Sequence, residues 1–473
     1  MDGKRKQPHD EPETTGEPHE ARGSSGAKMQ SHEPSDPERR WNELYAEPVD
    51  FKELSLRDAA FAAVVKGRDV NFNDPKAVQA LTKALLKRDF GLCLETPDDR
   101  LCPPVANRHN YILWLKKLLD STCYEPRSAG VLGLDIGTGA SCIYPLLGCT
   151  QRPWSFIATD IDPKSLEFAE RNVKRNGLEA KIKVVPRQPT DKLIPLDDLG
   201  IDAIDFCMTN PPFYTSDEQM RKSAEAKDRP PSTACTGAAV EMVTTGGEVG
   251  FVKRIIEESL EMKHRVGWYT SMVGFLASVI AIVEELRTHG IHNYAVTEFV
   301  QGNKTRRWAV GWSFRTMRPA QAIARGSASA TLRAYLPPVS EADVARLELG
   351  GSISKTANGI RDAIGELDLM HWVWDQQKMQ GTGRAADNVW NRAWRRKKKK
   401  MEMDGETIDV RERQDAAFGF EVWIRVGKHE MVVGCRWLEG HDAKLFESFQ
   451  GFLTSAAKAQ GSLLKVHNNK PKC

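Results

Sequence analysis

The chain has 473 residues, 40% of them hydrophobic, and a formal net charge of +3. This length suffices for two or three domains with apolar cores, which excludes a chain that is disordered throughout. No apolar run reaches membrane-spanning length, and the stretch MDGKRKQPHDEPETTGEPHE lacks the apolar segment of a secretory signal, so we expect a soluble, intracellular protein. The 9 cysteines form no C-x-x-C pair, which predicts reduced thiols, no disulfide framework and no metal site.

The N-terminal part of the chain changes character near residue 38. Residues 1–38 are rich in Pro, Glu, Gly, Ser and His without periodicity, which predicts a disordered tail. Further on, NDPKAVQALTKALLKRDFG predicts a helix with Asn73 or Asp74 as N-cap and Gly91 beyond its end. A second helix is predicted in NRHNYILWLKKLLDS. Together these helices form a prelude to the first strand.

From residue 131 the pattern alternates between strands and helices. The predicted strands lie in VLGLDIG, SFIATDID, KIKVV, AIDFCMTN, VGWYTSMVG, NYAVTEFVQ and RWAVGWSF. Apolar strands that alternate with helices predict an α/β fold with a doubly wound, mainly parallel sheet. The short polar connection GNKTR predicts that the last two strands form an antiparallel hairpin.

Residues 319–473 differ in composition and predict a second, smaller α+β domain. The segment 376–406 is polar and basic, so we expect it to be an exposed loop that interrupts this domain. After it, FGFEVWIRVGKHEMVVGCRWLEG predicts a β-hairpin that turns at Gly427, and DAKLFESFQGFLTSAAKA predicts a closing amphipathic helix.

A glycine motif, LDIGTGAS, follows the first strand of the alternating region. Gly137 and Gly139 allow a sharp turn and a close approach of the backbone to a ligand; the alternative is a tight strand-to-helix turn as in any α/β protein. Cys142 stands where the dinucleotide fingerprint has its third glycine, which argues against NAD. Asp160 or Asp162, at the end of the second strand, is placed to bind ribose hydroxyls; Asp162, before a proline, also suits a helix cap.

The motif NPPF follows the fourth strand, where two prolines end the strand and leave a rigid loop. The Asn210 side-chain oxygen and the Pro211 carbonyl can accept both hydrogens of an exocyclic amine and direct its lone pair at a sulfonium methyl. Phe213 can stack on an extruded base, which contributes about 1–3 kcal/mol. The alternative is a Pro-Pro strand stop without further function.

Two further features suit a ligand site but have plain alternatives. Arg108, in PPVANRHNY, can bind a carboxylate in a bidentate pair, or it can be a surface arginine at a helix start. Residues 227–250 are rich in small residues and glycine, which suits a mobile lid over a substrate groove, or a loop without structure.

Five stretches together resemble the methyltransferase-like 16 group of RNA N(6)-adenine methyltransferases, whose bacterial relatives modify large-subunit ribosomal RNA. They lie in order within residues 40–316 and are LCPPVANRHNYI, LDIGTGASCIYPLLG, DFCMTNPPF, GGEVGFVKRIIEESL and TEFVQGNKTRRWAVGWSF. The resemblance implies a Rossmann-like class I methyltransferase domain at 39–318, with a seven-stranded, mainly parallel sheet and a prelude that binds RNA. A weaker resemblance at 319–473 implies an RNA-binding accessory domain.

The resemblance also implies the cofactor and the residues that hold it. The methyl donor is S-adenosylmethionine, the product is S-adenosylhomocysteine, and no metal is implied. Arg108 is expected at the donor's carboxylate, Asp160 at its ribose, and Thr190 at its adenine, although VVPRQPTDKLI departs from the family pattern. The predicted donor site comprises Arg108, Asp135, Gly137, Thr138, Gly139, Ser141, Asp160, Thr190 and Asn210. The predicted catalytic loop comprises Asn210, Pro211, Pro212 and Phe213.

Basic clusters predict where RNA binds. The run WNRAWRRKKKK suits phosphate contacts, and its Trp390 and Trp394 could stack on bases. The same run suits a nuclear localisation signal, so we expect the nucleus, with the cytoplasm as a second location. The predicted RNA contacts are Arg229, Lys304, Arg306, Arg307, Arg395, Arg396, Lys397 and Lys398.

The sequence thus predicts an RNA N(6)-adenosine methyltransferase that acts on an extruded base in structured RNA. The resemblance implies U6 small nuclear RNA as substrate, with messenger RNA hairpins as further candidates. No membrane and no obligate protein partner are expected. One alternative is a protein glutamine methyltransferase with a related NPPY loop, and another is a non-catalytic RNA-binding splicing factor.

Overall fold

The computed structural model describes residues 36–65, 69–125, 130–216, 218–219, 237–301, 305–349, 352–403 and 416–461. Most of the predicted disordered tail, residues 1–35, lies outside these ranges. Helix α1 (Asp36–Glu43) begins inside the predicted tail, two residues before its expected end.

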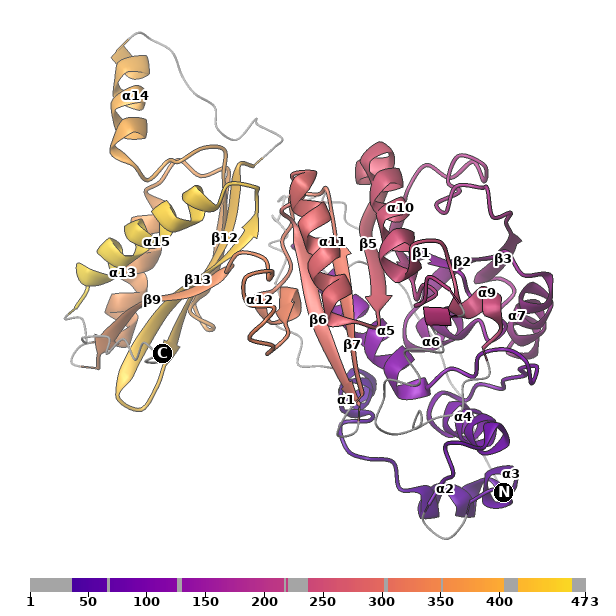
Figure 1. The fold of residues 1–473 in the computed structure, drawn as a ribbon. Helices are drawn as coiled ribbons and strands as arrows, with labels where there is room; N and C mark the ends of the chain where they lie inside the picture. The colour runs from indigo at the N-terminus through magenta and orange to yellow at the C-terminus, as the bar shows by residue number, and fades with distance from the viewer. Residues whose placement is uncertain are drawn as a thin grey trace, which may run out of the picture.

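A layer of helices precedes the first strand (Figure 1). After α1 it contains α2 (Phe51–Arg57), α3 (Ala59–Ala62), α4 (Pro75–Phe90) and α5 (Val105–Asp120). The side chain of Asp74, not Asn73, caps α4 by accepting the backbone N–H of Lys76 at 3.0 Å. Trp41 of α1 stacks on Phe90 of α4 with ring centroids 5.3 Å apart, so α1 is packed onto the two predicted prelude helices.

The larger sheet has the order β3-β2-β1-β4-β5-β7-β6-β8. Its strands are β1 (Val131–Ile136), β2 (Trp154–Asp160), β3 (Ile182–Pro186), β4 (Ile204–Thr209), β5 (Val266–Val273), β6 (Tyr294–Gln301), β7 (Thr305–Trp312) and β8 (Arg325–Gly326). The first five are parallel, and β6 and β7 form the predicted antiparallel hairpin. The seven predicted strands are therefore present, and the two-residue β8 adds an eighth at the edge beside β6.

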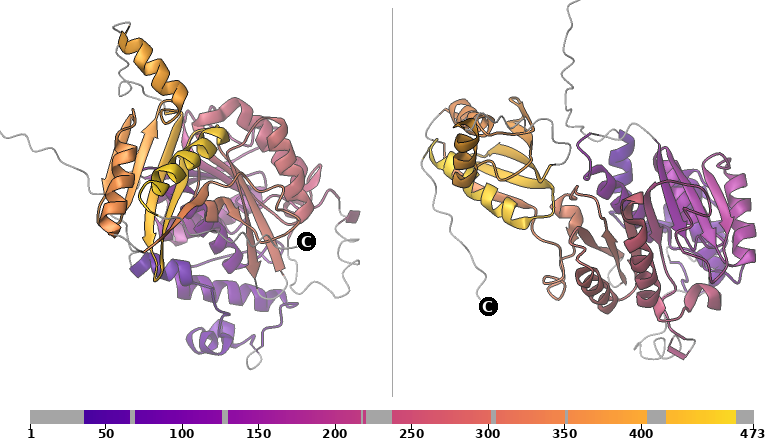
Figure 2. Two further views of the ribbon diagram at one scale, coloured as in Figure 1. Left: turned by 90° about the vertical axis from the view of Figure 1, so that its left-hand side faces the viewer. Right: turned by 90° about the horizontal axis from the view of Figure 1, so that it is seen from above.

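Helices cover both faces of this sheet (Figure 2). They are α6 (Ile143–Gln151), α7 (Pro163–Arg175), α10 (Gly247–Met262) and α11 (Leu276–Thr288), with the short α9 (Ala239–Met242) and the 3-10 turn η1 (Lys263–Arg265). Successive strand residues enter different cores: Phe206 of β4 packs with α4 to α7, whereas Cys207 packs with α10 and α11. Burial on both faces explains why these strands are apolar without alternation.

The chain order places a switch point between β1 and β4. From β1 the chain proceeds outward to β2 and β3 and then returns to the other side of β1 to form β4. Loops that leave the carboxyl ends of β1 and β4 therefore diverge and leave a crevice between them, which is where open α/β sheets bind ligands.

A second sheet, with the order β10-β11-β12-β13-β9, forms after a connecting segment that contains α12 (Gln321–Ala324). Its strands are β9 (Glu341–Glu348), β10 (His371–Asp375), β11 (Gln380–Ala385), β12 (Phe418–Val426) and β13 (Glu430–Glu439). Helices α13 (Ile353–Gly365) and α15 (Ala443–Lys458) pack on one face of this sheet. Both the hairpin at Gly427 and the closing helix are as predicted.

The described part of the segment 376–406, residues 376–403, is not the exposed loop that its composition predicted. It contains β11, which pairs with β10 and β12 inside the sheet, and α14 (Arg392–Met403), which projects away from it (Figure 1). Trp390 and Trp394 are only 6% and 5% exposed, so they are core residues and not stacking platforms for bases. Their indole N–H groups donate to Ser448 and Asp368, because a buried indole needs an acceptor.

A buried carboxylate joins the two sheets. Glu439, at the end of β13, accepts hydrogen bonds from Tyr124 at 2.8 Å, Arg384 at 2.9 Å and Thr316 at 3.2 Å. The guanidinium of Arg318 lies 3.6 Å from the ring centroid of Trp437 and donates to the Gly440 carbonyl at 2.8 Å. The contact between the two parts of the molecule is therefore made by polar side chains with defined partners.

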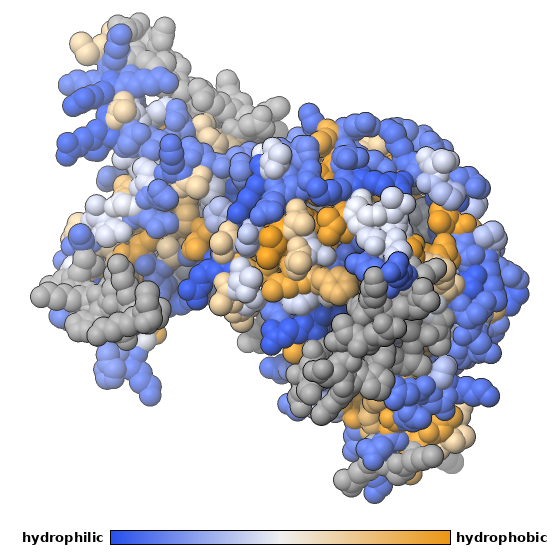
Figure 3. All heavy atoms as spheres, viewed as in Figure 1, coloured by the Kyte–Doolittle hydropathy of each residue, from blue (hydrophilic) through white to orange (hydrophobic). Residues whose placement is uncertain are grey.

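The surface is strongly hydrophilic where α14 projects at the upper left of Figure 3. The basic side chains of this helix are exposed along most of its length. Within the part of the chain that the structure describes, no helix combines the length and the apolar character needed to cross a membrane.

Candidate active site

The turn between β1 and α6 brings backbone donors to the crevice. Gly137 and Gly139 have φ angles of +74° and +64°, which residues with a Cβ rarely adopt. The N–H groups of Gly137 and Thr138 both donate to the Thr159 carbonyl at 2.9 Å, which holds the turn against the end of β2. This geometry explains the glycine spacing of the motif.

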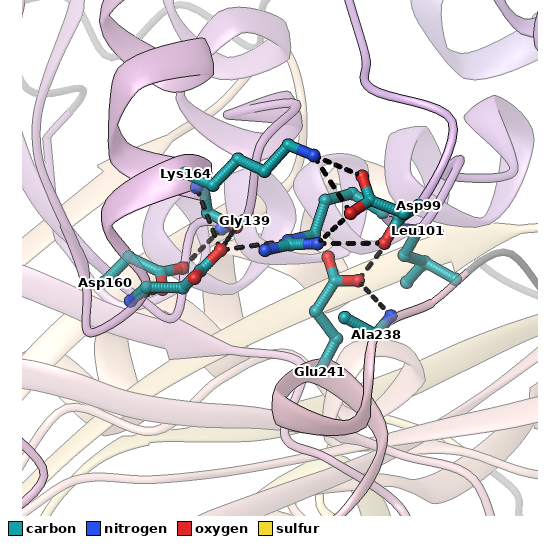
Figure 4. Close-up of polar contacts among 10 residues, drawn as sticks. Asp99, Leu101, Gly139, Asp160, Lys164, Ala238 and Glu241 are labelled. Atoms are coloured by element: carbon teal, nitrogen blue, oxygen red, sulfur yellow. Dashed lines mark hydrogen bonds and ion pairs between the residues drawn. The ribbon is translucent and has the colours of Figure 1, made fainter.

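Asp160 and Asp162 have different roles in the structure (Figure 4). The Asp160 carboxylate lines the crevice and accepts the N–H of Gly139 at 2.8 Å, and burial raises its pKa. Asp162 caps α7 by accepting the Ser165 N–H at 2.9 Å and is paired with Arg100 at 2.9 Å. Of the two carboxylates, Asp160 is thus the one that faces the crevice.

Asp135 lies beneath the turn and does not line the crevice. It is fully buried, and its Oδ2 accepts the Thr138 hydroxyl at 2.7 Å, whereas its Oδ1 has no partner. Burial raises the pKa of its carboxyl to about 7. Asp135 therefore supports the glycine turn from below through Thr138.

Arg108 extends from the first turn of α5 into the crevice. It is 6% exposed, and its guanidinium lies 5.5 Å from the ring centroid of Tyr144 and 3.6 Å from the sulfur of Met272. No carboxylate of the described ranges lies within ion-pair distance of it. A buried guanidinium without an anionic partner is costly in a protein interior, so this position favours an anionic ligand group.

The NPPF loop leaves β4 on the opposite side of the crevice. The Asn210 side-chain oxygen is buried and has no hydrogen-bond partner. The loop is held at its far end, because the Tyr214 N–H donates to the Met242 carbonyl and the Thr244 N–H donates to the Tyr214 carbonyl, both at 3.0 Å. The amide oxygen is therefore an available acceptor on a fixed backbone.

These elements surround a cavity of about 690 Å³, within the usual range for small-molecule sites. Nine predicted residues line it: Arg108, Gly137, Thr138, Gly139, Ser141, Asp160, Asn210, Pro211 and Pro212. Phe213 lies outside its lining, next to Arg307. Thr190 is exposed and does not line the cavity, although Pro189 and Asp191 beside it do, so the structure does not place Thr190 in the donor site.

Glu241 of α9 is a residue of this cavity that the sequence did not reveal (Figure 4). Its Oε2 accepts the N–H of Leu101 and the N–H of Ala238, both at 2.9 Å, and burial raises its pKa. It thereby ties the segment before α5 to the segment before α9 across 140 positions of sequence. No local pattern could have indicated this contact.

The structure describes the predicted lid, residues 227–250, only from residue 237 onward. Residues 227–236 lie outside the described ranges, whereas 237–250 contain α9 and the start of α10. The described half lines the cavity through Val240, Glu241 and Val243 to Gly246.

The predicted RNA contacts fall into separate groups. Arg229 and Lys304 lie outside the described ranges. Arg306 pairs with Glu298 at 2.6 Å, and the Arg307 guanidinium lies 5.4 Å from the Phe213 ring centroid. Arg395, Arg396, Lys397 and Lys398 are exposed on α14, where Lys398 is paired with Asp368 at 2.5 Å. Among the predicted contacts that the structure describes, only Arg306 and Arg307 are on the sheet that bears the cavity.

No cluster of three or more His, Cys, Asp or Glu side chains with the geometry of a metal site occurs among the residues placed by the structure. The cavity instead offers a guanidinium without an anionic partner, an amide oxygen without a hydrogen-bond partner and a glycine turn.

Comparisons with known proteins identify a family and several relatives of this chain. A family model described as RNA methyltransferase matches residues 43–316. A Schizosaccharomyces pombe relative named U6 small nuclear RNA (adenine-(43)-N(6))-methyltransferase is 37% identical over 398 residues, which cover 83% of this chain and 96% of the relative. The Homo sapiens relative, RNA N(6)-adenosine-methyltransferase METTL16, is 42% identical over 288 residues, 58% of this chain and 50% of the relative. This chain thus matches about half the length of the human protein.

Among solved structures, the hMettl16 catalytic domain in complex with the MAT2A 3'UTR hairpin 1 is similar to this fold. It has a TM-score of 0.52 and 42% sequence identity, and the match covers 57% of this chain and 92% of that one.

Proposed function

The chain belongs to the RNA methyltransferase family, and from this membership and its cavity we propose that it methylates N6 of an extruded adenosine in structured RNA. The observation that carries the proposal is that Arg108, buried without an anionic partner, and the Asn210 amide oxygen, buried without a hydrogen-bond partner, line one cavity at the switch point. The methyl donor is S-adenosylmethionine, whose sulfonium makes its methyl group electrophilic.

The cavity fits this donor group by group. Arg108 offers a buried cation for the donor's carboxylate, and a guanidinium binds a carboxylate in a bidentate pair. Asp160 retains acceptor capacity for ribose hydroxyls, because each carboxylate oxygen has two lone pairs and accepts one backbone N–H here. The Gly137 and Gly139 turn leaves the backbone exposed to a ligand without side-chain atoms in the way.

The NPPF loop then makes the acceptor amine reactive. The Asn210 oxygen and the Pro211 carbonyl accept the two amine hydrogens, which draws the nitrogen lone pair out of conjugation with the ring and toward the methyl group. As the N–CH3 bond forms, the S–CH3 bond of the sulfonium would break and leave a neutral thioether, and the nitrogen would release one proton to solvent without a general base. Phe213 stacks on the extruded base, which offsets part of the cost of unstacking it.

The substrate proposal extends to U6 small nuclear RNA, since the S. pombe relative, 96% of which is matched by this chain, is named for that RNA. Messenger RNA hairpins are a second substrate class, because a similar structure is a complex with one. We further propose that residues 319–473 act as the RNA-binding accessory domain, through the exposed cations of α14, and that the protein acts in the nucleus.

A methyl-transfer assay with radiolabelled donor tests the proposal. The panel contains U6 RNA, the same RNA with its target adenosine replaced by guanosine, matched DNA and a protein release factor. We expect label on U6 alone, lost with guanosine and recovered as N(6)-methyladenosine.

Each other outcome selects an alternative function. Label on the release factor alone would support a protein glutamine methyltransferase. Tight RNA binding without any label would support a non-catalytic RNA-binding factor and refute the proposed activity.

A further inference from the structure

A buried carboxylate lies behind the NPPF loop, outside the cavity described above. Glu248 is in the first turn of α10 and is 2% exposed. Its two oxygens accept the N–H groups of Gly274 at 2.7 Å and of Phe275 at 3.1 Å, at the turn between β5 and α11. Because both oxygens are used by the backbone, Glu248 holds this turn at two consecutive residues.

Gly274 of this turn contacts Phe213 of the NPPF loop, and Phe275 contacts Tyr214, the residue after the loop. A Cβ on Gly274 would lie 3.0 Å from Cδ1 and 3.2 Å from Cε1 of the Phe213 ring, so the ring is packed directly on the Gly274 backbone. The ring of Phe275 meets that of Tyr214 edge-on, with centroids 6.3 Å apart. The turn held by Glu248 is thus the support of two successive aromatic residues.

Charge also links Glu248 to the ring of Phe213. The guanidinium of Arg307 lies 5.4 Å from the Phe213 ring centroid. Burial and the nearby Arg108 cation lower the pKa of Arg307, whereas the Glu248 carboxylate raises it and so stabilises the charged guanidinium. Glu248 therefore supports Phe213 through the turn and also favours the cation beside it.

We propose that Glu248 is a positioning residue for the target base: it sets the Phe213 ring plane, and through it the orientation of the amine toward Asn210, without touching RNA or donor. This inference rests on the proposed methyl transfer. Its physical basis is that a misplacement of about 1 Å in a reacting geometry can cost a factor of roughly 100 in rate.

The test is Glu248→Gln in the full chain. An amide has one acceptor oxygen, so one of the two turn N–H groups loses its partner. We expect kcat on saturating U6 RNA to fall about 10- to 100-fold, with the KM for donor and the calorimetric affinity for S-adenosylhomocysteine unchanged.

Glu258→Gln is the matched control. Glu258 is on the same helix and also accepts two backbone N–H groups, those of Leu193 at 2.8 Å and Ile194 at 2.9 Å, but it does not contact the NPPF loop. At saturating donor we expect its kcat to equal that of the unmodified protein.

Gly274→Ala keeps Glu248 itself but crowds the same contact, because its Cβ would lie 3.0 Å from the Phe213 ring and 3.3 Å from the Glu248 carboxylate, so both must shift slightly. It provides the test if Glu248→Gln does not fold, and the same loss of kcat is expected.

A double-mutant cycle separates positioning from general destabilisation. On a Phe213→Ala background, Glu248→Gln should change kcat less than twofold, because the residue through which it acts is already gone. A full additional loss, or an unchanged kcat in Glu248→Gln and Gly274→Ala, would overturn the inference. An unmodified protein without activity on any RNA would instead refute the proposed function itself.

Discussion

At the carboxyl edge of the eight-stranded sheet, Arg108 is buried without an anionic partner and the Asn210 side-chain oxygen is buried without a hydrogen-bond partner. At the end of β13 in the five-stranded sheet, by contrast, the buried Glu439 accepts bonds from three side chains. In the first sheet the unpaired polar groups face a cavity, and in the second the unpaired charges are on the exposed helix α14.

The difference separates two kinds of recognition. Buried unpaired groups suit a small ligand that replaces their lost hydration with hydrogen bonds in a fixed geometry. Exposed lysines and arginines suit a polyanion, whose binding releases counterions and requires no fixed partner. Changes in the first region should therefore affect catalysis and donor binding, and changes in the second should affect the salt dependence of RNA binding.

Asn210→Ala should have the largest effect. It removes one of two oxygens that orient the amine, and loss of one such group at a reaction centre costs roughly a factor of 100 to 1,000 in kcat. Single-turnover methylation of U6 RNA measures this loss, with RNA affinity followed by filter binding. Substantial retained activity would refute the amine-positioning mechanism.

Arg108→Ala should weaken donor binding about 10- to 100-fold, since hydrogen bonds to charged groups contribute about 1.5–3 kcal/mol. Calorimetry with S-adenosylmethionine gives the affinity directly. Arg108→Lys keeps the charge but loses the bidentate geometry, so it should recover only part of the affinity. An unaltered affinity in Arg108→Ala would remove this residue from the donor site.

Neutralising Lys397, Lys399 and Lys400 of α14 together should weaken RNA binding. It should also make the negative slope of log affinity against log salt less steep, by about 2 to 3. These three lysines are exposed, whereas Lys398 is engaged by Asp368. Lys398→Gln is therefore the control with a smaller expected effect on the slope. If the slope of the triple variant did not change, α14 would keep only its proposed role in nuclear localisation.

Asp135→Asn should change the pH dependence of stability, the smallest of these effects. The pKa of Asp135 is raised by burial to about 7 in the folded chain, so the folded state binds a proton more tightly than the unfolded state. This contribution is fully present below the ordinary carboxyl pKa, about 3.9, and is lost as pH rises through about 7.

Melting temperatures from pH 5 to 8 measure the effect. The melting temperature of the unmodified protein should fall relative to that of Asp135→Asn as pH increases. A constant difference between the two would contradict the raised pKa.

Seven of the eight strands of the larger sheet and the residues of its two motifs followed from the sequence, because each depends on local chemistry. Apolar strands that are buried on both faces, prolines that end β4 and glycines in left-handed conformations all leave a pattern within a few residues. The same holds for the hairpin at Gly427 and the cap of α4 by an Asx residue.

Tertiary structure decided what depends on contacts between distant segments. It buried Trp390 and Trp394 beside a run of lysines, drew β11 from a polar segment into a sheet, and left Thr190 outside the cavity. It also brought Glu241 to Leu101 and Glu248 to Gly274. A carboxylate that accepts backbone N–H groups has no preferred sequence partner, since every residue except proline offers the same donor. Such contacts are specified only when the whole chain has folded.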